Sequence, residues 1–224
     1  MRLRSPRSEA AAAFDAAGRP SSRTPWREAR WCALDLELTG LDPSNDEIIA
    51  VGAVPIEDGR LMLGESRYTL VRTERRSEHN AVLVHKLRVA DLADAPPLDE
   101  ALELVMELLS GRIPVFHTAV VERMFLKPLF AALRVRLPAA ADTEVLGRLL
   151  VLERGGTASG HLSLDRLAEM LGQSGEAPHH ALADALMTGQ AFIALASHLD
   201  AIRPQTIGSL VNAANLLGGP HRRG

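Results

Sequence analysis

Apolar and polar residues alternate with a period of two over residues 31–39. Leucines occupy one face of this segment, and Asp35 and Glu37 lie on the other, as in a β-strand with one apolar face. Residues 47–56 are almost entirely apolar and predict a buried strand, and residues 61–72 predict a third. Because only short turns separate the three segments, we expect an antiparallel meander.

The spacing of apolar residues changes to that of helices after residue 97. Two short strands, at residues 113–117 and 138–142, interrupt the helical segments. Three strands followed by helices that alternate with two more strands predict an α/β fold with a mixed sheet. The helices are expected at residues 97–109, 120–133, 144–152, 163–171, 180–202 and 206–217.

The two ends of the chain differ from its middle. Residues 1–28 are rich in Arg, Ala, Ser and Pro without periodicity, which predicts a disordered tail or, as the alternative, a basic arm that touches nucleic acid or a partner. Residues 29–203 are expected to form the functional domain, and residues 204–224 a short amphipathic helix and a tail. The apolar face of that helix fits docking on its own domain or on a partner helix.

Composition and charge narrow the function classes. The chain has 224 residues and a net charge of −3, and its single cysteine, Cys32, excludes an intrachain disulfide framework and a thiolate zinc cluster. Seven arginines and three acids lie in residues 1–30, so the remainder is acidic and does not favour duplex binding by bulk charge. The longest uncharged stretch, residues 185–199, is too short to span a membrane. No signal-peptide core follows the first arginines, so we expect a cytoplasmic protein.

Asp35 and Glu37 are the first candidate functional residues. They lie two positions apart on a strand and therefore point to the same side of the sheet. A solvated strand face would explain them, but the next strand is apolar on both faces, which indicates a sheet covered on both sides. Two unpaired carboxylates in such a sheet would be costly, and a divalent cation such as Mg²⁺ or Mn²⁺ would remove that cost.

Three further candidates stand at the starts of predicted helices. Glu122 follows the strand at residues 113–117, and Asp184 lies in the first turns of the apolar helix at residues 180–202. Each acid alone is explained by the positive end of its helix. That explanation does not cover His179, which lies just before the second helix, where a base could reach a bound water.

Together these residues resemble the DEDDh branch of the DnaQ-like 3′–5′ exonucleases, which includes proteins like the epsilon subunit of DNA polymerase III. Asp35-x-Glu37 is followed by Glu122 and by His179-x₄-Asp184 in the family's order, and the match spans residues 30–202. Glu122 stands where most members carry Asp, and it keeps the charge on a side chain longer by one methylene. The resemblance implies a ribonuclease H-like α/β fold. Its five-stranded mixed sheet would join an antiparallel meander of three strands to two parallel strands, with helices on either side.

The resemblance also implies a chemistry. The chain would be a metal-dependent exonuclease that hydrolyses phosphodiester bonds at the 3′ end of single-stranded nucleic acid, DNA in preference to RNA, and releases nucleoside 5′-monophosphates. Asp35, Glu37 and Asp184 would hold two Mg²⁺ or Mn²⁺ ions, with Glu122 in the outer ligation. His179 would act as the general base. The terminal nucleotide would contact Leu38, Thr39, Gly40 and Leu41, with His85 at the edge of its slot.

Two other functions remain open at this point. The first is a proofreading subunit that works with a polymerase partner. The second is a catalytically weak module that binds nucleic acid, which the replacement at Glu122 would suggest and the presence of both His179 and Asp184 argues against. A monomer and a homodimer are both compatible with the sequence.

Overall fold

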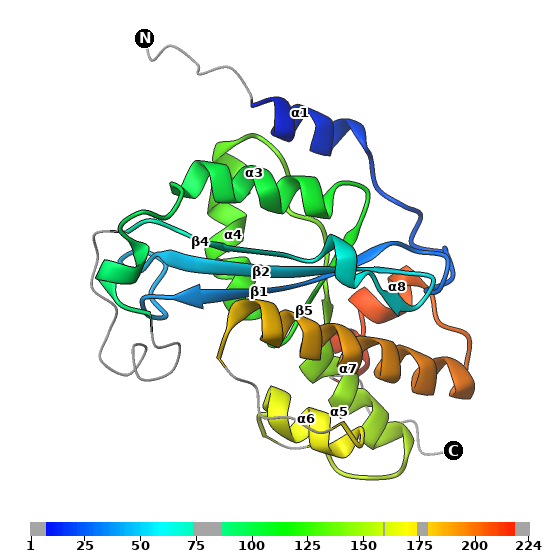
Figure 1. The fold of residues 1–224 in the computed structure, drawn as a ribbon. Helices are drawn as coiled ribbons and strands as arrows, with labels where there is room; N and C mark the ends of the chain where they lie inside the picture. Colours follow the sequence, from blue (N-terminus) through cyan, green and yellow to red (C-terminus); the bar gives the residue numbers. More distant parts are fainter. Residues whose placement is uncertain (1–7, 74–86, 159, 174–178, 218–224) are drawn as a thin grey trace.

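A mixed β-sheet forms the centre of the molecule (Figure 1). The computed structural model describes residues 8–73, 87–158, 160–173 and 179–217. Within these residues the strand order is β3-β2-β1-β5-β6, and β4 also pairs with β2. Strand β2 pairs antiparallel with β1, β3 and β4, whereas β5 pairs parallel with both β1 and β6. The strands are β1 (Trp31–Leu38), β2 (Ile48–Glu57), β3 (Arg60–Leu61), β4 (Arg67–Leu70), β5 (Ile113–Phe116) and β6 (Ala141–Asp142).

The sheet confirms the predicted α/β class and corrects its strand count. The expected third strand at residues 61–72 is divided into β3 and β4, which gives six strands where five were expected. A short 3₁₀ turn, Leu63–Glu65, interrupts it, and the Ser66 hydroxyl donates a 2.7 Å hydrogen bond to the Leu63 carbonyl. Gly64 within this turn has no side chain to pack on the sheet, which weakens a strand at that point.

Helices cover both faces of the sheet (Figure 1). The leucines of β1 pack with α1, α3 and α4 on one face, while Trp31 and Ala33 pack with α5 and α7 on the other. The sheet is therefore buried on both sides, as the apolar β2 segment predicts. The helices are α1 (Glu9–Ala16), α3 (Leu98–Leu109), α4 (Val120–Ala132), α5 (Thr143–Glu153), α6 (Leu164–Met170), α7 (Ala181–Ile202), α8 (Ile207–Val211) and α9 (Ala214–Leu217).

The N-terminal segment differs from the expected disordered tail. Residues 9–16 form α1, and the side chain of Ser8 caps the helix by accepting a bond from the Ala11 amide. Phe14 packs edge-on against Phe130 at a ring distance of 5.5 Å, and Trp26 is only 1% exposed. Burial of these aromatic rings offsets the entropy lost when the segment folds. The functional-domain boundaries at residues 29 and 203 stay a prediction.

The C-terminal segment packs on its own domain. The helix expected at residues 206–217 is divided into α8 and α9, and Ile207 and Leu210 are buried in the cluster beneath α5 and α7. A hydrogen bond of 3.0 Å from the Ile207 amide to the Thr24 carbonyl fastens α8 to the N-terminal segment. The apolar face of α8 is therefore used within this chain.

Helix α7 is long and apolar enough to cross a membrane if only its length and composition are considered. In the fold it packs against β1 and β2, and the side chains of Phe192 and Leu195 are fully buried. The sheet therefore accounts for the apolar character of this helix, and length and composition are weak evidence for a membrane span.

Candidate active site

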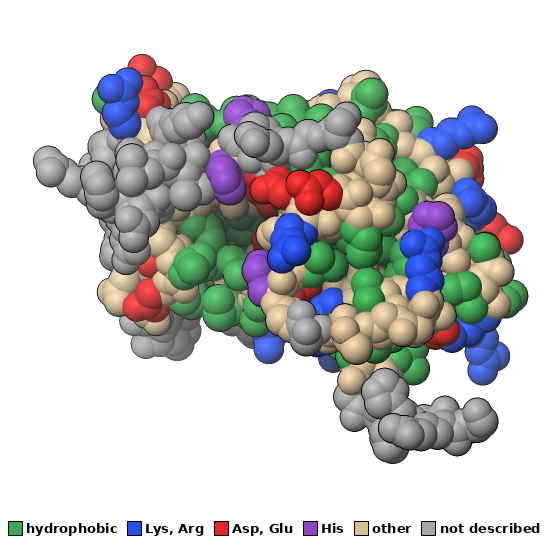
Figure 2. Space-filling view, turned by 90° about the horizontal axis from the view of Figure 1, so that it is seen from below, with side chains coloured by type: hydrophobic (Ala, Val, Ile, Leu, Met, Phe, Trp, Pro, Cys, Tyr) green, Lys and Arg blue, Asp and Glu red, His purple; other side chains and the backbone are tan. Residues whose placement is uncertain are grey.

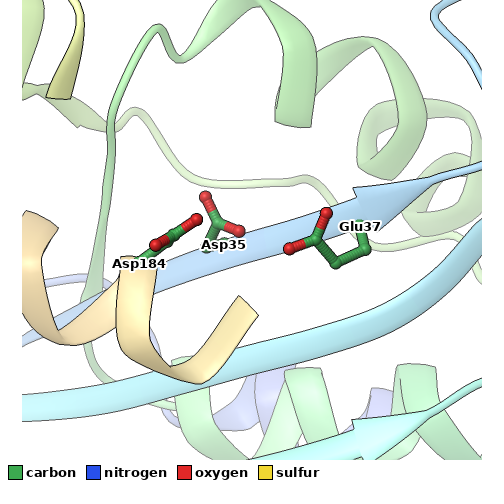
Figure 3. A group of neighbouring side chains, drawn as sticks. All are labelled: Asp35, Glu37 and Asp184. Carbon is green, nitrogen blue, oxygen red and sulfur yellow. The ribbon is translucent and has the colours of Figure 1, made fainter. Parts of the chain in front are cut away.

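Three carboxyl groups from two distant segments meet on one side of the sheet. Asp35 and Glu37 extend from β1, and Asp184 extends from the first turn of α7 (Figure 3). One carboxyl oxygen from each residue lies within 4.8 Å of the other two. The period of two along β1 places Asp35 and Glu37 on the same side, and the packing of α7 over β1 and β2 supplies the third group.

Gly52 allows α7 to come this close to the sheet. It is paired with Asp35 across the β1–β2 ladder. A Cβ atom on Gly52 would lie 2.1 Å from the Ala181 carbonyl carbon and 2.2 Å from the Leu182 nitrogen. The first turn of α7 therefore rests directly on this glycine. Sequence reasoning missed Gly52, although an isolated glycine inside an apolar strand is a signal of close backbone approach.

Burial and mutual repulsion raise the pKa values of the three carboxyl groups. The pKa of Asp35 is raised well above its usual range, first by burial and then by the charges of Glu122, Asp184 and Glu37. Burial and the charge of Asp184 raise the pKa of Glu37 to about 7. Burial raises the pKa of Asp184 to about 6, against the opposing effect of His179. The negative charges of the three carboxyl groups are therefore not balanced by nearby positive charge.

The unpaired oxygens of these carboxyl groups fit a divalent cation. Among the described residues, Glu37 Oε1 and Asp184 Oδ1 are buried and have no hydrogen-bond partner. Buried acceptors without donors are costly, and a hard cation such as Mg²⁺ or Mn²⁺ takes oxygen ligands of this kind. The donor set is therefore that of a divalent metal site, and its individual ligand roles stay a prediction.

Glu122 faces the same site from the first turn of α4. It is 5% exposed, and its Oε2 atom has no hydrogen-bond partner within the described part of the chain. Its charge raises the pKa of Asp35, although its oxygens lie outside the group of three. Burial, with a further contribution from Asp142, raises the pKa of Glu122 to about 8. Glu122 thus adds a fourth uncompensated carboxyl group beside the other three.

The loop that leads into α4, the helix of Glu122, is held by Asp142 at the end of β6. Asp142 Oδ2 accepts a 2.9 Å bond from the Ala119 amide, just before α4, and Oδ1 accepts a 2.9 Å bond from the Glu144 amide at the start of α5. Thr118 has a φ of 56°, a strained conformation for a β-branched residue, and its hydroxyl donates to Glu144 Oε2. Asp142 thus caps α5 and also fixes the start of α4.

His179 lies immediately before α7 and is exposed to solvent. Its φ of 48° turns the backbone sharply into the helix. The charge of His179 lowers the pKa of Asp184, so His179 lies on the side of the helix start that faces the carboxyl groups. The next residue, His180, stacks on Tyr68 of β4 at a ring distance of 4.4 Å. A histidine next to the carboxyl groups and open to solvent can exchange a proton with a bound water.

The segment expected to bind the terminal nucleotide has one exposed side chain. Leu41 is 68% exposed, whereas Thr39 is fully buried and donates to Asp46 Oδ1 at 2.9 Å. Gly40 packs against Asp46, where a Cβ atom would lie 2.5 Å from a carboxyl oxygen. Leu38 is buried in the core, and His85 lies outside the described residues. The substrate roles of all five stay a prediction.

Comparison with known proteins decides the family. The model of the RNase_T family, described as "Exonuclease", matches residues 32–192. The chain belongs to this exonuclease family. This match confirms the resemblance on which the candidate residues were selected, and it spans the strands and helices that carry the four acids and His179.

Two curated relatives of this chain are named as polymerase proteins. The chain is 33% identical to a DNA polymerase III subunit epsilon-like protein of Rhodobacter capsulatus, over 88% of this chain and 29% of that protein. It is 31% identical to a PolC-type DNA polymerase III of Thermotoga petrophila, over 75% of this chain and 12% of that protein. The chain thus spans less than a third of the length of either relative.

Solved structures of other proteins share the fold of this chain. Exonuclease X, solved in complex with 5′-overhanging duplex DNA, has a TM-score of 0.60 at 19% identity, over 82% of this chain and 98% of that one. Exonuclease I has a TM-score of 0.65 at 15% identity, over 78% of this chain and 44% of that one. These likenesses confirm the ribonuclease H-like fold.

The raised pKa values of the acids predict that pH affects the stability of the protein when no divalent cation is present. The folded protein retains protons that the unfolded chain has released, because Glu37 and Glu122 have folded-state pKa values of about 7 and about 8 against an ordinary value of 4.5. Stability therefore falls as the pH rises from about 4.5 to about 8. Urea unfolding in chelator should show a loss of at least about 2 kcal/mol between these limits.

The variant Glu122→Gln provides the control for this pH dependence. It removes one of the buried carboxyl groups, so the fall in stability should be smaller, and Mn²⁺ added to the wild type at pH 8 should restore part of the loss. A free energy of unfolding that is constant over this range in chelator would contradict the buried and uncompensated state of the cluster.

Proposed function

We propose that this chain is a metal-dependent 3′–5′ exonuclease that degrades single-stranded nucleic acid, DNA in preference to RNA. It would release nucleoside 5′-monophosphates. The observation that carries this proposal is the group of buried carboxyl oxygens from Asp35, Glu37 and Asp184, which lie within 4.8 Å of one another. The preference for DNA rests on the names of the relatives, which are DNA polymerase III proteins, and on exonuclease structures solved with DNA.

The proposed chemistry assigns one task to each side chain. Asp35, Glu37 and Asp184 would hold two Mg²⁺ or Mn²⁺ ions, with Glu122 in the outer ligation, and these ions would supply positive charge to the phosphate and acidify a water. His179 would accept the proton of that water on a ring nitrogen, because imidazole exchanges protons readily near neutral pH. Its exposed position before α7 leaves the ring room to move toward the substrate.

The terminal nucleotide is expected to lie along the segment after β1. Leu41, which is 68% exposed, offers an apolar side chain that can insert beside the last base. Val120, the first residue of α4 and two positions before Glu122, is 62% exposed and adds apolar surface at the start of this helix. An exposed apolar side chain on each of these two segments suits contact with an unstacked base.

The function is tested by following the shortening of 5′-labelled single-stranded DNA and RNA with Mg²⁺ or Mn²⁺. The wild type should give a ladder that shortens stepwise from the 3′ end, with DNA the faster substrate. His179→Ala should lower kcat by roughly 10²- to 10⁴-fold, because the general base is lost while the carboxyl ligands stay in place. Calorimetric titration of the variant with Mn²⁺ should still show binding.

His198→Ala is the matched control for this experiment. His198 is an exposed histidine on the same helix, α7, and its replacement should leave kcat unchanged. Cleavage within the strand, or no cleavage of either nucleic acid with either metal, would contradict the proposed activity. In the second case Mn²⁺ binding without cleavage would favour the weak nucleic-acid-binding module.

The names of the relatives favour a second candidate, a proofreading subunit that acts with a polymerase. The chain would then bind the polymerase by a surface other than the buried face of α8, which packs on its own domain. Size-exclusion chromatography with a purified replicative polymerase should show co-elution in that case, and the same run would report whether the chain is a monomer or a homodimer.

A further inference from the structure

A pocket with two arginines lies between α5 and α6. Residues of α5, residues 157–158 and 160–162 of the following loop and helix α6 line this pocket, which has a volume of about 490 Å³. Figure 2 views the molecule from the side on which α5 and α6 lie, and it shows Arg and His side chains close to acidic ones on this face. The polar and charged side chains that line the pocket belong to Arg148, Thr157, His161, Arg166 and Glu169.

Arg148 is the polar centre of this pocket. Its Nε atom is buried and has no acceptor among the described residues, and its Nη2 atom reaches only the Ala158 carbonyl, at 3.4 Å. A guanidinium carries five N–H donors, and the buried Nε donor is left without a partner at a cost in free energy. Within the described ranges neither Arg148 nor Arg166 forms an ion pair with a carboxylate. The Nε donor of Arg148 therefore lacks an acceptor, and an oxyanion in the pocket would supply one.

Packing and hydrogen bonds within the described residues hold α5, α6 and the residues just before α6 together at the pocket. Gly147 lets α6 and the preceding loop approach α5, because a Cβ atom there would lie 2.8 Å from Leu167 and 2.9 Å from Leu162. Glu144 Oε1 accepts bonds from His161 Nδ1 at 3.0 Å and from the Leu162 amide at 3.1 Å. This leaves His161 Nε2 for a ligand. A preformed pocket loses little entropy when it binds.

Hydrogen bonds of Glu144 connect the pocket with the candidate active site. One carboxyl oxygen accepts from His161 and Leu162 at the pocket, and the second accepts a 2.9 Å bond from Thr118, in the loop that leads to Glu122. A strand whose 3′ end occupies the site would therefore pass near the pocket with a phosphate farther along its backbone.

We infer that this pocket, defined by Arg148 and Arg166, binds a backbone phosphate of the substrate strand upstream of the scissile bond. The inference rests on the proposed exonuclease function. A guanidinium offers paired N–H donors whose geometry matches two phosphate oxygens. The two arginines that line the pocket outweigh the carboxylate of Glu169 at its exposed rim. The pocket thereby gives an acidic protein one local contact with an anionic strand.

The test compares a dinucleotide, whose one phosphodiester bond is the scissile bond and which has no phosphate upstream of it, with a ten-nucleotide DNA strand. Arg148→Gln and Arg166→Gln should each raise KM for the ten-nucleotide strand roughly tenfold, since a charge-assisted bond to phosphate is lost. Their kcat values and their KM for the dinucleotide should match the wild type. Arg166 is exposed, so its variant keeps the test valid if Arg148→Gln fails to fold.

Arg60→Gln is the matched control, because Arg60 is exposed on β3 at the opposite end of β2 from the carboxyl group cluster. An equal rise of KM for both substrates in the pocket variants would overturn the inference, as would unchanged KM values for both. If the wild type cuts neither substrate, the proposed function fails, and the pocket is judged by fluorescence anisotropy of the labelled ten-nucleotide strand. Equal affinity of wild type and variants would then overturn the inference.

Free phosphate is the other source of the same chemistry. Inorganic phosphate and a nucleoside 5′-monophosphate are titrated as competitors against the wild type and Arg148→Gln. These anions could compete less well against Arg148→Gln than against the wild type, while the KM of the variant for the ten-nucleotide strand equals that of the wild type. In that case the pocket binds free phosphate or product, and the inference of strand binding is wrong.

Discussion

Asp35→Asn is expected to lower kcat by a factor on the order of 10³ or more while leaving the fold intact. Asn keeps the shape of the side chain but removes the charge at the centre of the group of three carboxyl oxygens. The metal-free variant should also unfold at a higher urea concentration than the wild type at pH 8. The reason is that the pKa of Asp35 is raised by burial and by three neighbouring acids, so its ionised form is destabilising without a cation.

Opposite changes in activity and in stability distinguish a metal ligand from a structural residue. The two measurements are kcat on single-stranded DNA and urea unfolding in chelator, with Mn²⁺ binding followed by calorimetry. Asp58→Asn is the control, because Asp58 is exposed in the turn between β2 and β3 and has a φ of 51° that Asn tolerates. Wild-type Mn²⁺ affinity in Asp35→Asn would falsify the assignment of Asp35 as a ligand.

The parts of the fold that depend on local pattern could be predicted from the sequence. The alternation over residues 31–39 gives β1 and the side on which Asp35 and Glu37 lie. Apolar spacing gives α3 and α7 to within one residue at the ends. Each of these signals comes from neighbouring positions on one element, where the backbone period alone decides which face is buried.

The parts that depend on distant contacts could not be predicted. Helix α1 is stabilised by the packing of Phe14 on Phe130, and Trp26 packs edge-on against Phe192 at 6.1 Å. No local period marks either contact, so the segment gives only the composition of a tail. The same holds for Asp142, since its bond to the Ala119 amide exists only because β6 pairs in parallel with β5.

The candidate site shows both cases. The motif places Asp35, Glu37 and Asp184 in one set, and the structure brings one oxygen of each together. What determines their separation is the height of α7 above β2, and that height depends on Gly52, which carries none of the chemistry. The motif identifies the reacting carboxyl groups, whereas the packing that positions them depends on residues without polar side chains.

Gly52→Ala is therefore expected to have the largest effect of any single methyl group added to this site. The new Cβ atom would lie 2.1 Å from the Ala181 carbonyl carbon, and backbone atoms of a packed helix cannot move aside as a flexible side chain can. The start of α7 must shift away from β2 and carry Asp184 with it. We expect a loss of about 3 kcal/mol in the free energy of unfolding, with weaker Mn²⁺ binding and a kcat reduced at least about tenfold.

Gly64→Ala is the matched control for this substitution, because nothing lies within 4 Å of a Cβ atom at that position. Its stability should stay within about 0.5 kcal/mol of the wild type or rise slightly, since alanine restricts the unfolded chain. Urea unfolding of both variants with and without Mn²⁺ separates two effects. A loss of stability in Gly52→Ala that Mn²⁺ fully reverses, with wild-type kcat, would mean that α7 adapts to the methyl group. A loss that persists with saturating Mn²⁺ would show that the separation of Asp184 from Asp35 is set by the contact of α7 with Gly52.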